Sequence, residues 1–192
     1  IATFDLFLKT EAGLCRNTIV RYMKCFKRIT NMALAKEWMR KDPFYGYKMA
    51  QDETDPVFLT YPELKSIMEK EFTIPRLALV RDIFVFAAFT GLAFADVSTL
   101  TKDNLVQDNN GDWWIRKGRV KLERRHRASS VCNIPLLPVP LAILKKYEEH
   151  PICRKKSLCL PVICNQRMNS YLKEIADLCN IRKNLTTHTA KH

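Results

Sequence analysis

The segment Pro75–Leu100, PRLALVRDIFVFAAFTGLAFADVSTL, decides how this sequence folds. Up to Phe89 it is apolar on nearly every side of a helical wheel, which is typical of a helix buried in the core of a domain. Glycine commonly ends a helix, so Gly91 marks the end of this one. Charged residues interrupt and bound the apolar run, so it is shorter than the roughly eighteen apolar residues of a membrane span. The sequence therefore predicts a globular domain centred on this helix.

The charge of the chain indicates a polyanionic partner. Its 192 residues include 32 Lys and Arg against 20 Asp and Glu, which gives a formal net charge of +12 and a pI near 9.5. Such an excess is typical of proteins that bind nucleic acid. A protein that is basic without such a partner is the alternative that composition leaves open.

The cysteines and histidines favour neither a disulfide framework nor a metal site. The seven cysteines form an odd set without a Cys-x-x-Cys pair, which favours reduced thiols in a cytoplasm. His188 and His192 are four residues apart, a spacing that could hold a metal on a helix. The glutamate of a metalloprotease helix is missing, however, and Lys191 between them would repel a cation. We expect no metal and no cofactor.

A long amphipathic helix is predicted between Asn17 and Trp38, because apolar residues recur there at steps of three and four. Asn17 or Thr18 is placed to cap its start. One face carries cations that we expect to contact DNA phosphates: Arg21, Lys24, Lys27 and Arg28. A face that is merely solvated is the alternative interpretation.

A polar stretch, Gln51–Pro56, is predicted to separate two domains, at residues 1–52 and 57–192. The second domain begins with a capping box, Thr60-Tyr61-Pro62-Glu63, which starts a helix.

Three short strands are predicted in the second domain, near residues 104–107, 112–121 and 130–136. The loop between the last two is strongly basic, and we expect three of its side chains to contact DNA: Arg124, Arg125 and Arg127. Further helices are expected near residues 141–147 and 169–179 and from Thr186 onward. The predicted fold class is mainly α with a small antiparallel β-sheet.

Features in this order resemble the motifs of the tyrosine recombinases, also called phage integrases. The segment Thr90-Gly91-Leu92-Ala93 is similar to the family's Thr-Gly-Leu-Arg box, with alanine in place of the arginine. The hairpin from Trp113 to Lys121 resembles the strand that carries the family's catalytic lysine. Asn133–Leu144 resembles the third strand and the helix after it, and Asn165–Ala176 the helix before the last box, in a form associated with Bacteroides-type mobile elements. His188-Thr189-Ala190-Lys191 is similar to that last box, His-x-x-Arg, with lysine in place of the arginine.

The resemblance implies a role for each matching side chain. Lys121 would supply a proton to the 5′ oxygen that leaves, as a hydroxyl, when a DNA strand is cut. His188 and Lys191 would contact the phosphate oxygens and stabilise the charge of the transition state, although lysine lacks the planar fork of arginine. Arg119 lies two residues before Lys121, on the same face of a strand, and could supply the guanidinium that Ala93 lacks. A non-specific backbone contact is the alternative role for Arg119.

As a whole, the resemblance implies a helical core-binding domain at residues 1–52 and a tyrosine recombinase catalytic domain at residues 57–192, incomplete at both ends. The parent protein would be a cytoplasmic, DNA-associated bacterial enzyme for site-specific recombination and integration of mobile DNA. It would cleave double-stranded DNA through a 3′-phosphotyrosyl link, as a tetramer assembled on DNA, without a cofactor and away from membranes. Every tyrosine of this chain precedes the last box, whereas the family's nucleophile follows it. We therefore expect this chain to bind DNA but to be inactive in cleavage; a regulatory, non-catalytic DNA-binding relative is the alternative.

Overall fold

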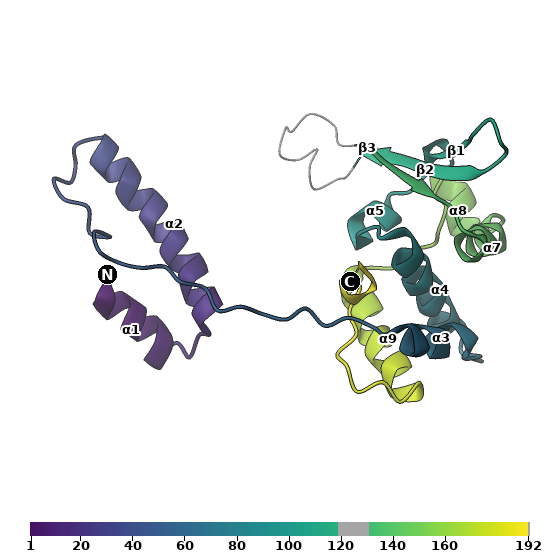
Figure 1. Cartoon of the computed structure of the whole chain (residues 1–192), viewed down its shortest axis with the longest axis horizontal. Helices are drawn as coiled ribbons and strands as arrows, with labels where there is room; N and C mark the ends of the chain where they lie inside the picture. The colour runs from purple at the N-terminus through teal and green to yellow at the C-terminus, as the bar shows by residue number, and fades with distance from the viewer. Residues whose placement is uncertain (119–130, 192) are drawn as a thin grey trace. The chain divides into compact units, whose positions relative to one another are not determined.

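The computed structural model describes residues 1–118 and 131–191, which form two compact units, Ile1–Asp55 and Pro56–His192. We call them unit 1 and unit 2 (Figure 1). The described residues are mostly helical with one three-stranded antiparallel sheet, so the predicted fold class is confirmed. Within these ranges, no helix is both long and apolar enough to cross a membrane.

Unit 1 is built from two helices, α1 (Ala2–Thr10) and α2 (Arg16–Ala35). A small apolar core holds them together, because Met23 of α2 is fully buried and Phe44, from the segment after α2, is 2% exposed. Phe44 also contacts neighbouring rings edge to face, such as Phe26 at 5.6 Å between ring centroids. Aromatic pairs in this geometry add to the stability of a small core.

The start of α2 differs from the prediction. The helix begins after Cys15, and neither Asn17 nor Thr18 is its cap, so the capping prediction is wrong. The side chain of Asn17 is engaged elsewhere: its amide nitrogen donates to the carbonyl oxygen of Asp52 (3.0 Å) and its oxygen accepts from the Asp52 N–H (2.9 Å). Asn17 therefore attaches the end of unit 1 to α2.

The end of α2 also comes earlier than the predicted Trp38. Glu37 adopts a left-handed conformation with φ of 59°, and the N–H of Trp38 donates to the carbonyl of Ala33 at 2.9 Å. This pattern closes a helix and usually uses glycine at the left-handed position. Because this position holds a glutamate and not a glycine, no local pattern in the sequence predicts the end of α2.

Unit 2 is built around α4 (Pro75–Thr90), the helix predicted to be buried. Phe84 and Phe86 are 1% and 0% exposed, and Gly91 ends the helix with φ of 64°. Three helices pack against α4: α3 (Tyr61–Glu69), α7 (Pro138–Tyr147) and α9 (Asn165–Leu178). Shorter elements complete the unit: α5 (Phe94–Ser98), η1 (Lys102–Asn104), α8 (Pro151–Lys156) and η2 (Thr189–Lys191).

The sheet of unit 2 has the strand order β1-β2-β3. Its strands are β1 (Leu105–Gln107), β2 (Trp113–Gly118) and β3 (Val131–Pro135). Ile115, in the middle of β2, is fully buried and lies opposite Leu105 and Ile134 on the neighbouring strands. The side chains on either side of Ile115 along the strand point to the other face. The three strands were predicted at these places; the rest of the second predicted strand lies outside the described residues.

The predicted capping box at the start of α3 is present. One oxygen of Glu63 accepts hydrogen bonds from the N–H and the hydroxyl of Thr60, at 2.7 and 2.9 Å. The same oxygen accepts from Nζ of Lys183 at 2.7 Å. The Lys183 hydrogen bond, helped by the Thr60 N–H, lowers the pKa of Glu63 below its usual value.

A buried carboxylate joins α4 to α7. Asp82 is 5% exposed and accepts from Nε of Arg81 (2.6 Å), Nζ of Lys146 (2.7 Å) and the hydroxyl of Tyr147 (2.8 Å). A charge buried in this way is stable only with such partners. Burial, and then the hydrogen bond to Asp82, raises the pKa of Tyr147 far above its usual value.

The later helices begin before their predicted starts. The helix predicted at 141–147 begins at Pro138, in agreement with the preference of proline for the first turn, and the helix predicted at 169–179 begins at Asn165. The helix predicted from Thr186 onward is reduced to the short 3₁₀ turn η2. There the hydroxyl of Thr189 accepts from the Thr186 N–H at 3.2 Å, which favours a turn over a helix.

Candidate nucleic-acid interface

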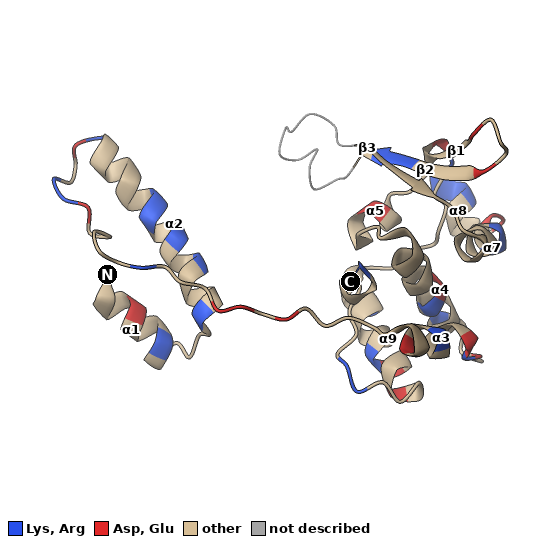
Figure 2. Ribbon diagram, viewed as in Figure 1, with Lys and Arg blue, Asp and Glu red and all other residues tan. Residues whose placement is uncertain are grey.

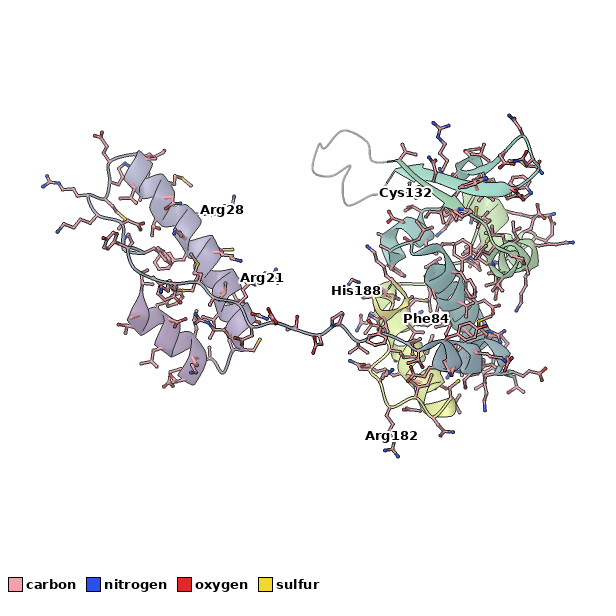
Figure 3. The ribbon with its side chains drawn as sticks, in the orientation of Figure 1. Arg21, Arg28, Phe84, Cys132, Arg182 and His188 are labelled. Atoms are coloured by element: carbon pink, nitrogen blue, oxygen red, sulfur yellow. The ribbon has the colours of Figure 1, made fainter. Side chains whose placement is uncertain are left out.

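The cationic face of α2 is the strongest charged feature of unit 1. Arg21, Lys24 and Arg28 are exposed and lie three and four residues apart, so they share one side of the helix. The sequence of α2 contains no acidic residue. Figure 2 shows Lys and Arg residues spaced along α2, and Figure 3 labels Arg21 and Arg28 on it. This face has the charge and spacing to contact a phosphate backbone.

Two lysines of α2, Lys24 and Lys27, interact within unit 1. Nζ of Lys24 donates to the side-chain oxygen of Gln51 at 3.0 Å. Lys27 is half-buried, with Nζ 5.8 Å from the centre of the Phe44 ring. Either lysine would have to leave its present partner to reach a phosphate. The two arginines are therefore the principal candidates on this helix.

The predicted Thr-Gly-Leu-Ala box lies between α4 and α5. Ala93 is the N-cap of α5 and is half-buried, and its methyl group offers no hydrogen-bond donor. Asp96, one turn further on, is 4% exposed. The alanine position therefore cannot bind a phosphate through its own side chain.

The predicted His188 box is a turn fixed to α9. The N–H of Thr187 donates to Oδ1 of Asn169 at 2.8 Å, and the hydroxyl of Thr187 donates to Oδ1 of Asn165, also at 2.8 Å. His188 follows directly and is exposed; Figure 3 labels it at the surface of unit 2. A backbone held in this way presents an imidazole to solvent from a fixed point.

Lys191 ends the described chain in the 3₁₀ turn η2 and is exposed. Its N–H donates to the carbonyl of His188 at 3.1 Å. In a 3₁₀ turn, side chains three residues apart lie one above the other. His188 and Lys191 therefore belong to the same side of the turn, although the longer helix predicted for them is absent from the described residues.

The segment that follows the first box and the segment that contains the second pack on the same part of the core. A cavity of about 10 Å³ is lined by Phe94 of α5 and by Thr187 and Ala190 of the terminal segment, together with residues of α4 and α9. Since η2 also packs against α4, the segments after Gly91 and around His188 are neighbours in unit 2 although they are far apart in the sequence.

The sheet is attached to α5 by Lys117, a residue that no sequence motif marked. Nζ of Lys117 donates to the carbonyl of Thr99, the C-cap of α5, at 2.9 Å, and to Oδ1 of Asn104 at 3.4 Å. In the sequence, only its position on the predicted strand indicated that Lys117 could have a structural role. The sequence also did not reveal the roles of Asn165 and Asn169. Their only sign in the sequence is that they lie four residues apart and precede the Thr-Thr-His segment.

Several predicted site residues lie outside the described residues. These are Arg119, Lys121, Arg124, Arg125 and Arg127, and His192 of the rejected metal pair. Among the residues that the structure does describe, no group of three or more His, Cys, Asp or Glu could hold a metal ion.

Three tyrosines of the chain have clear packing roles. The hydroxyl of Tyr147 is buried against Asp82, and that of Tyr47 donates to Asp5 at 2.8 Å. The ring of Tyr171 lies 5.0 Å from the guanidinium of Arg76. Burial raises the pKa of both Tyr47 and Tyr147, so their phenolate forms are disfavoured. These hydroxyls are poorly suited to nucleophilic attack.

Comparison with known proteins supports the resemblance drawn from the sequence. Residues 1–49 match the family model described as Phage integrase SAM-like domain. A comparison with curated proteins finds no match.

Solved structures match the fold over nearly the whole chain. The Tn1549 transposon integrase in complex with circular intermediate DNA is 18% identical, with a TM-score of 0.70 over 99% of this chain. The XerH site-specific recombinase bound to palindromic difH substrate, a post-cleavage complex, is 17% identical, with a TM-score of 0.66 over 100% of this chain. The chain spans 68% and 59% of those two structures and 41% of a pre-cleavage complex of XerH. The chain therefore combines a phage integrase SAM-like domain with the fold of the tyrosine recombinases.

Proposed function

We propose that this chain is part of a site-specific DNA recombinase of the tyrosine type and that it binds double-stranded DNA. The fold carries this proposal, because it matches over 99% of the chain a transposon integrase whose structure is a complex with DNA. The net charge of +12 and the cationic face of α2 support it. Both features favour a polyanion over a neutral or acidic partner.

Each unit has a distinct task in this proposal. Residues 1–52 act as a core-binding domain whose Arg21 and Arg28 contact phosphates, with Lys24 and Lys27 joining once released from Gln51 and Phe44. Residues 57–192 act as the catalytic domain, and Arg124, Arg125 and Arg127 add backbone contacts. Phosphate contacts release counterions, so the affinity for DNA falls as salt rises. Assembly as a tetramer on DNA belongs to the full-length protein.

The reacting phosphate is held by side chains of unit 2. His188 and Lys191 contact its non-bridging oxygens and stabilise the negative charge that develops there. Lys121 donates a proton to the leaving 5′ oxygen, which departs as a hydroxyl. Arg119 supplies the guanidinium absent at Ala93; a backbone contact elsewhere on DNA is its alternative role.

The chain by itself binds DNA without cutting it. Ala93 and Lys191 stand where the family resemblance calls for arginines, and Tyr47 and Tyr147 are hydrogen-bonded with raised pKa values. Ala93 at the α5 N-cap favours a second candidate function, a regulatory relative that occupies DNA sites without chemistry.

Two measurements test the function. In fluorescence anisotropy with a short labelled duplex, the chain should bind at low salt, and log K should fall linearly with log salt. A complete lack of binding at low salt would contradict DNA binding. With a nicked suicide substrate we expect no covalent protein–DNA adduct, and an adduct would overturn the claim that the chain is inactive.

The role of Arg119 has its own test. The Arg119→Ala variant should lose affinity for DNA, and adding Ala93→Arg should restore part of it. An Arg119→Ala variant that binds DNA like the parent would show that Arg119 does not replace the missing guanidinium.

A further inference from the structure

We infer that Asn165 and Asn169 are positioning residues that hold His188 ready to contact a phosphate. This inference rests on the proposed function, in which His188 contacts a phosphate. It gives a role to the two hydrogen bonds that hold Thr187, the residue before His188. Neither asparagine would touch DNA. Their effect would pass through the backbone at Thr187.

The two asparagines belong to a rigid part of unit 2. They are four residues apart on α9, so they lie on the same side of that helix. Between and after them, Met168 and Leu172 are 1% and 0% exposed and anchor α9 in the core. The oxygens of Asn165 and Asn169 are therefore fixed acceptors, placed by a packed helix.

Both acceptors bind one residue. Asn169 accepts the N–H of Thr187 and Asn165 accepts its hydroxyl, each at 2.8 Å. These two hydrogen bonds restrain the backbone and the side chain of the same threonine. The peptide that leads into His188 can then adopt few orientations.

The residue after His188 is restrained as well. Thr189 is 5% exposed, its hydroxyl lies 3.2 Å from the N–H and from the hydroxyl of Thr186, and its N–H donates to the Thr186 carbonyl at 3.0 Å. Exposed His188 is thus bracketed by Thr187, tied to α9, and by Thr189, buried in the turn. An exposed side chain on a backbone fixed at both neighbours is the arrangement expected of a pre-organised contact residue.

Pre-organisation has a measurable consequence. A loop that is already ordered loses less conformational entropy when it binds, so it binds more tightly than a loose loop with the same side chain. If the asparagines only stabilised the fold, their loss would weaken DNA binding whether or not His188 is present. If they act through His188, their loss should matter only while His188 is there, which a double-mutant cycle detects.

The experiment uses the whole chain and a short labelled DNA duplex. Asn169→Leu removes the acceptor at nearly constant volume, and Asn169→Asp keeps an acceptor at the same place. Each is compared with the parent and in a His188→Ala background. Gln166→Ala, exposed on the same helix, is the matched control. Hydrogen exchange at the Thr187 amide and thermal unfolding are measured for every variant.

We expect Asn169→Leu to lower DNA affinity about fivefold in the parent, the scale of one lost hydrogen bond, and less than twofold when His188 is alanine. The Thr187 amide should exchange faster in Asn169→Leu and at the parental rate in Asn169→Asp, and Gln166→Ala should change nothing. If Asn169→Leu fails to fold, the milder Asn165→Ala takes its place in the cycle.

The inference would be overturned if Asn169→Leu lowered DNA affinity equally in the parent and in the His188→Ala background, or in neither. The proposed function would still stand in that case, provided that His188→Ala itself weakens binding. An unchanged affinity in His188→Ala alone would overturn both the phosphate role of His188 and the inference built on it.

Discussion

Unit 1 and unit 2 use their cations differently. On α2 of unit 1, Arg21 and Arg28 are exposed on a helix without acidic residues. In unit 2, several cations close ion pairs that join different segments: Arg76 of α4 with Glu174 of α9 at 3.0 Å, Lys146 of α7 with Asp82 of α4 at 2.7 Å, and Lys183 with Glu63 of α3 at 2.7 Å; Arg81 also pairs with Asp82, its neighbour within α4, at 2.6 Å. Figure 2 shows blue and red segments close together in unit 2.

This difference separates cations that hold the fold from cations that can hold a ligand. A paired cation must break its bond before it can contact a phosphate, whereas an exposed arginine on a helix is available at once. In unit 2, His188 and Lys191 are exposed on a turn that hydrogen bonds of Thr187 and Thr189 hold in place. Loss of a paired group should therefore affect stability, and loss of an exposed cation should affect DNA affinity.

The largest effect is expected at the buried ion pair. Asp82→Ala removes the carboxylate that accepts from Nε of Arg81 and from the Tyr147 hydroxyl, and removing one partner of a buried pair costs about 3–5 kcal/mol. Urea unfolding of unit 2 should show this loss, while the exposed control Asp103→Ala should unfold like the parent. A loss below about 1 kcal/mol would show that Asp82 does not hold α4 to α7.

The next effect concerns the exposed face of α2. Arg21→Ala with Arg28→Ala should leave the unfolding midpoint unchanged but weaken binding to duplex DNA about tenfold at low salt, and flatten the slope of log K against log salt by about two. The matched control replaces Lys9 and Lys41, two exposed lysines of unit 1 outside α2. Equal losses in both double variants would mean that only total charge matters, against a specific role for α2.

Tyr147→Phe tests a smaller contribution to stability and its pH dependence. The variant removes one donor to Asp82, so it should unfold about 1 kcal/mol more easily at pH 7. Because the folded-state pKa of Tyr147 is raised, its contribution is fully present below the unfolded value of about 10 and is lost as pH rises beyond it. The difference in free energy of unfolding between the parent and the variant should therefore narrow above pH about 10. A gap that stays constant across that range would contradict the raised pKa; Tyr45→Phe, at an exposed position, is the control.

The smallest effect is expected at the turn. Lys191→Arg restores a planar fork that can hold two phosphate oxygens, so DNA affinity should rise about threefold in anisotropy measurements. Lys41→Arg in unit 1 should change affinity much less. A weaker Lys191→Arg variant would indicate that this position does not face a phosphate.

The helices that the sequence predicted best are those with a strong periodic or capping signal. Apolar residues on all sides placed α4, and the Thr60–Glu63 box placed α3. Predictions failed where a side chain had an unforeseen partner. Asn17 looks like a helix cap in the sequence, yet it binds Asp52, thirty-five residues away. Glu37 closes α2 in a conformation that glycine normally takes, which no local pattern reveals.

The sequence singles out His188 and Lys191 as candidate reactive residues, but it does not single out the residues that support them. His188 and Lys191 stand out by their order and spacing in the chain. Asn165, Asn169 and Lys117 do not, because each matters only through a bond to a distant segment. The contact of Lys117 with Thr99 requires the sheet and α5 to be assembled first.

The central claim, that DNA meets the cationic face of α2 and the His188 turn, is tested most directly by hydrogen exchange with and without a short DNA duplex. We predict that DNA slows exchange in α2 and in residues 186–191, and leaves α7 and the core of α4 unchanged. The claim would be contradicted if bound DNA slowed hydrogen exchange only in α7 and α8. It would also be contradicted if bound DNA slowed exchange neither in α2 nor in residues 186–191.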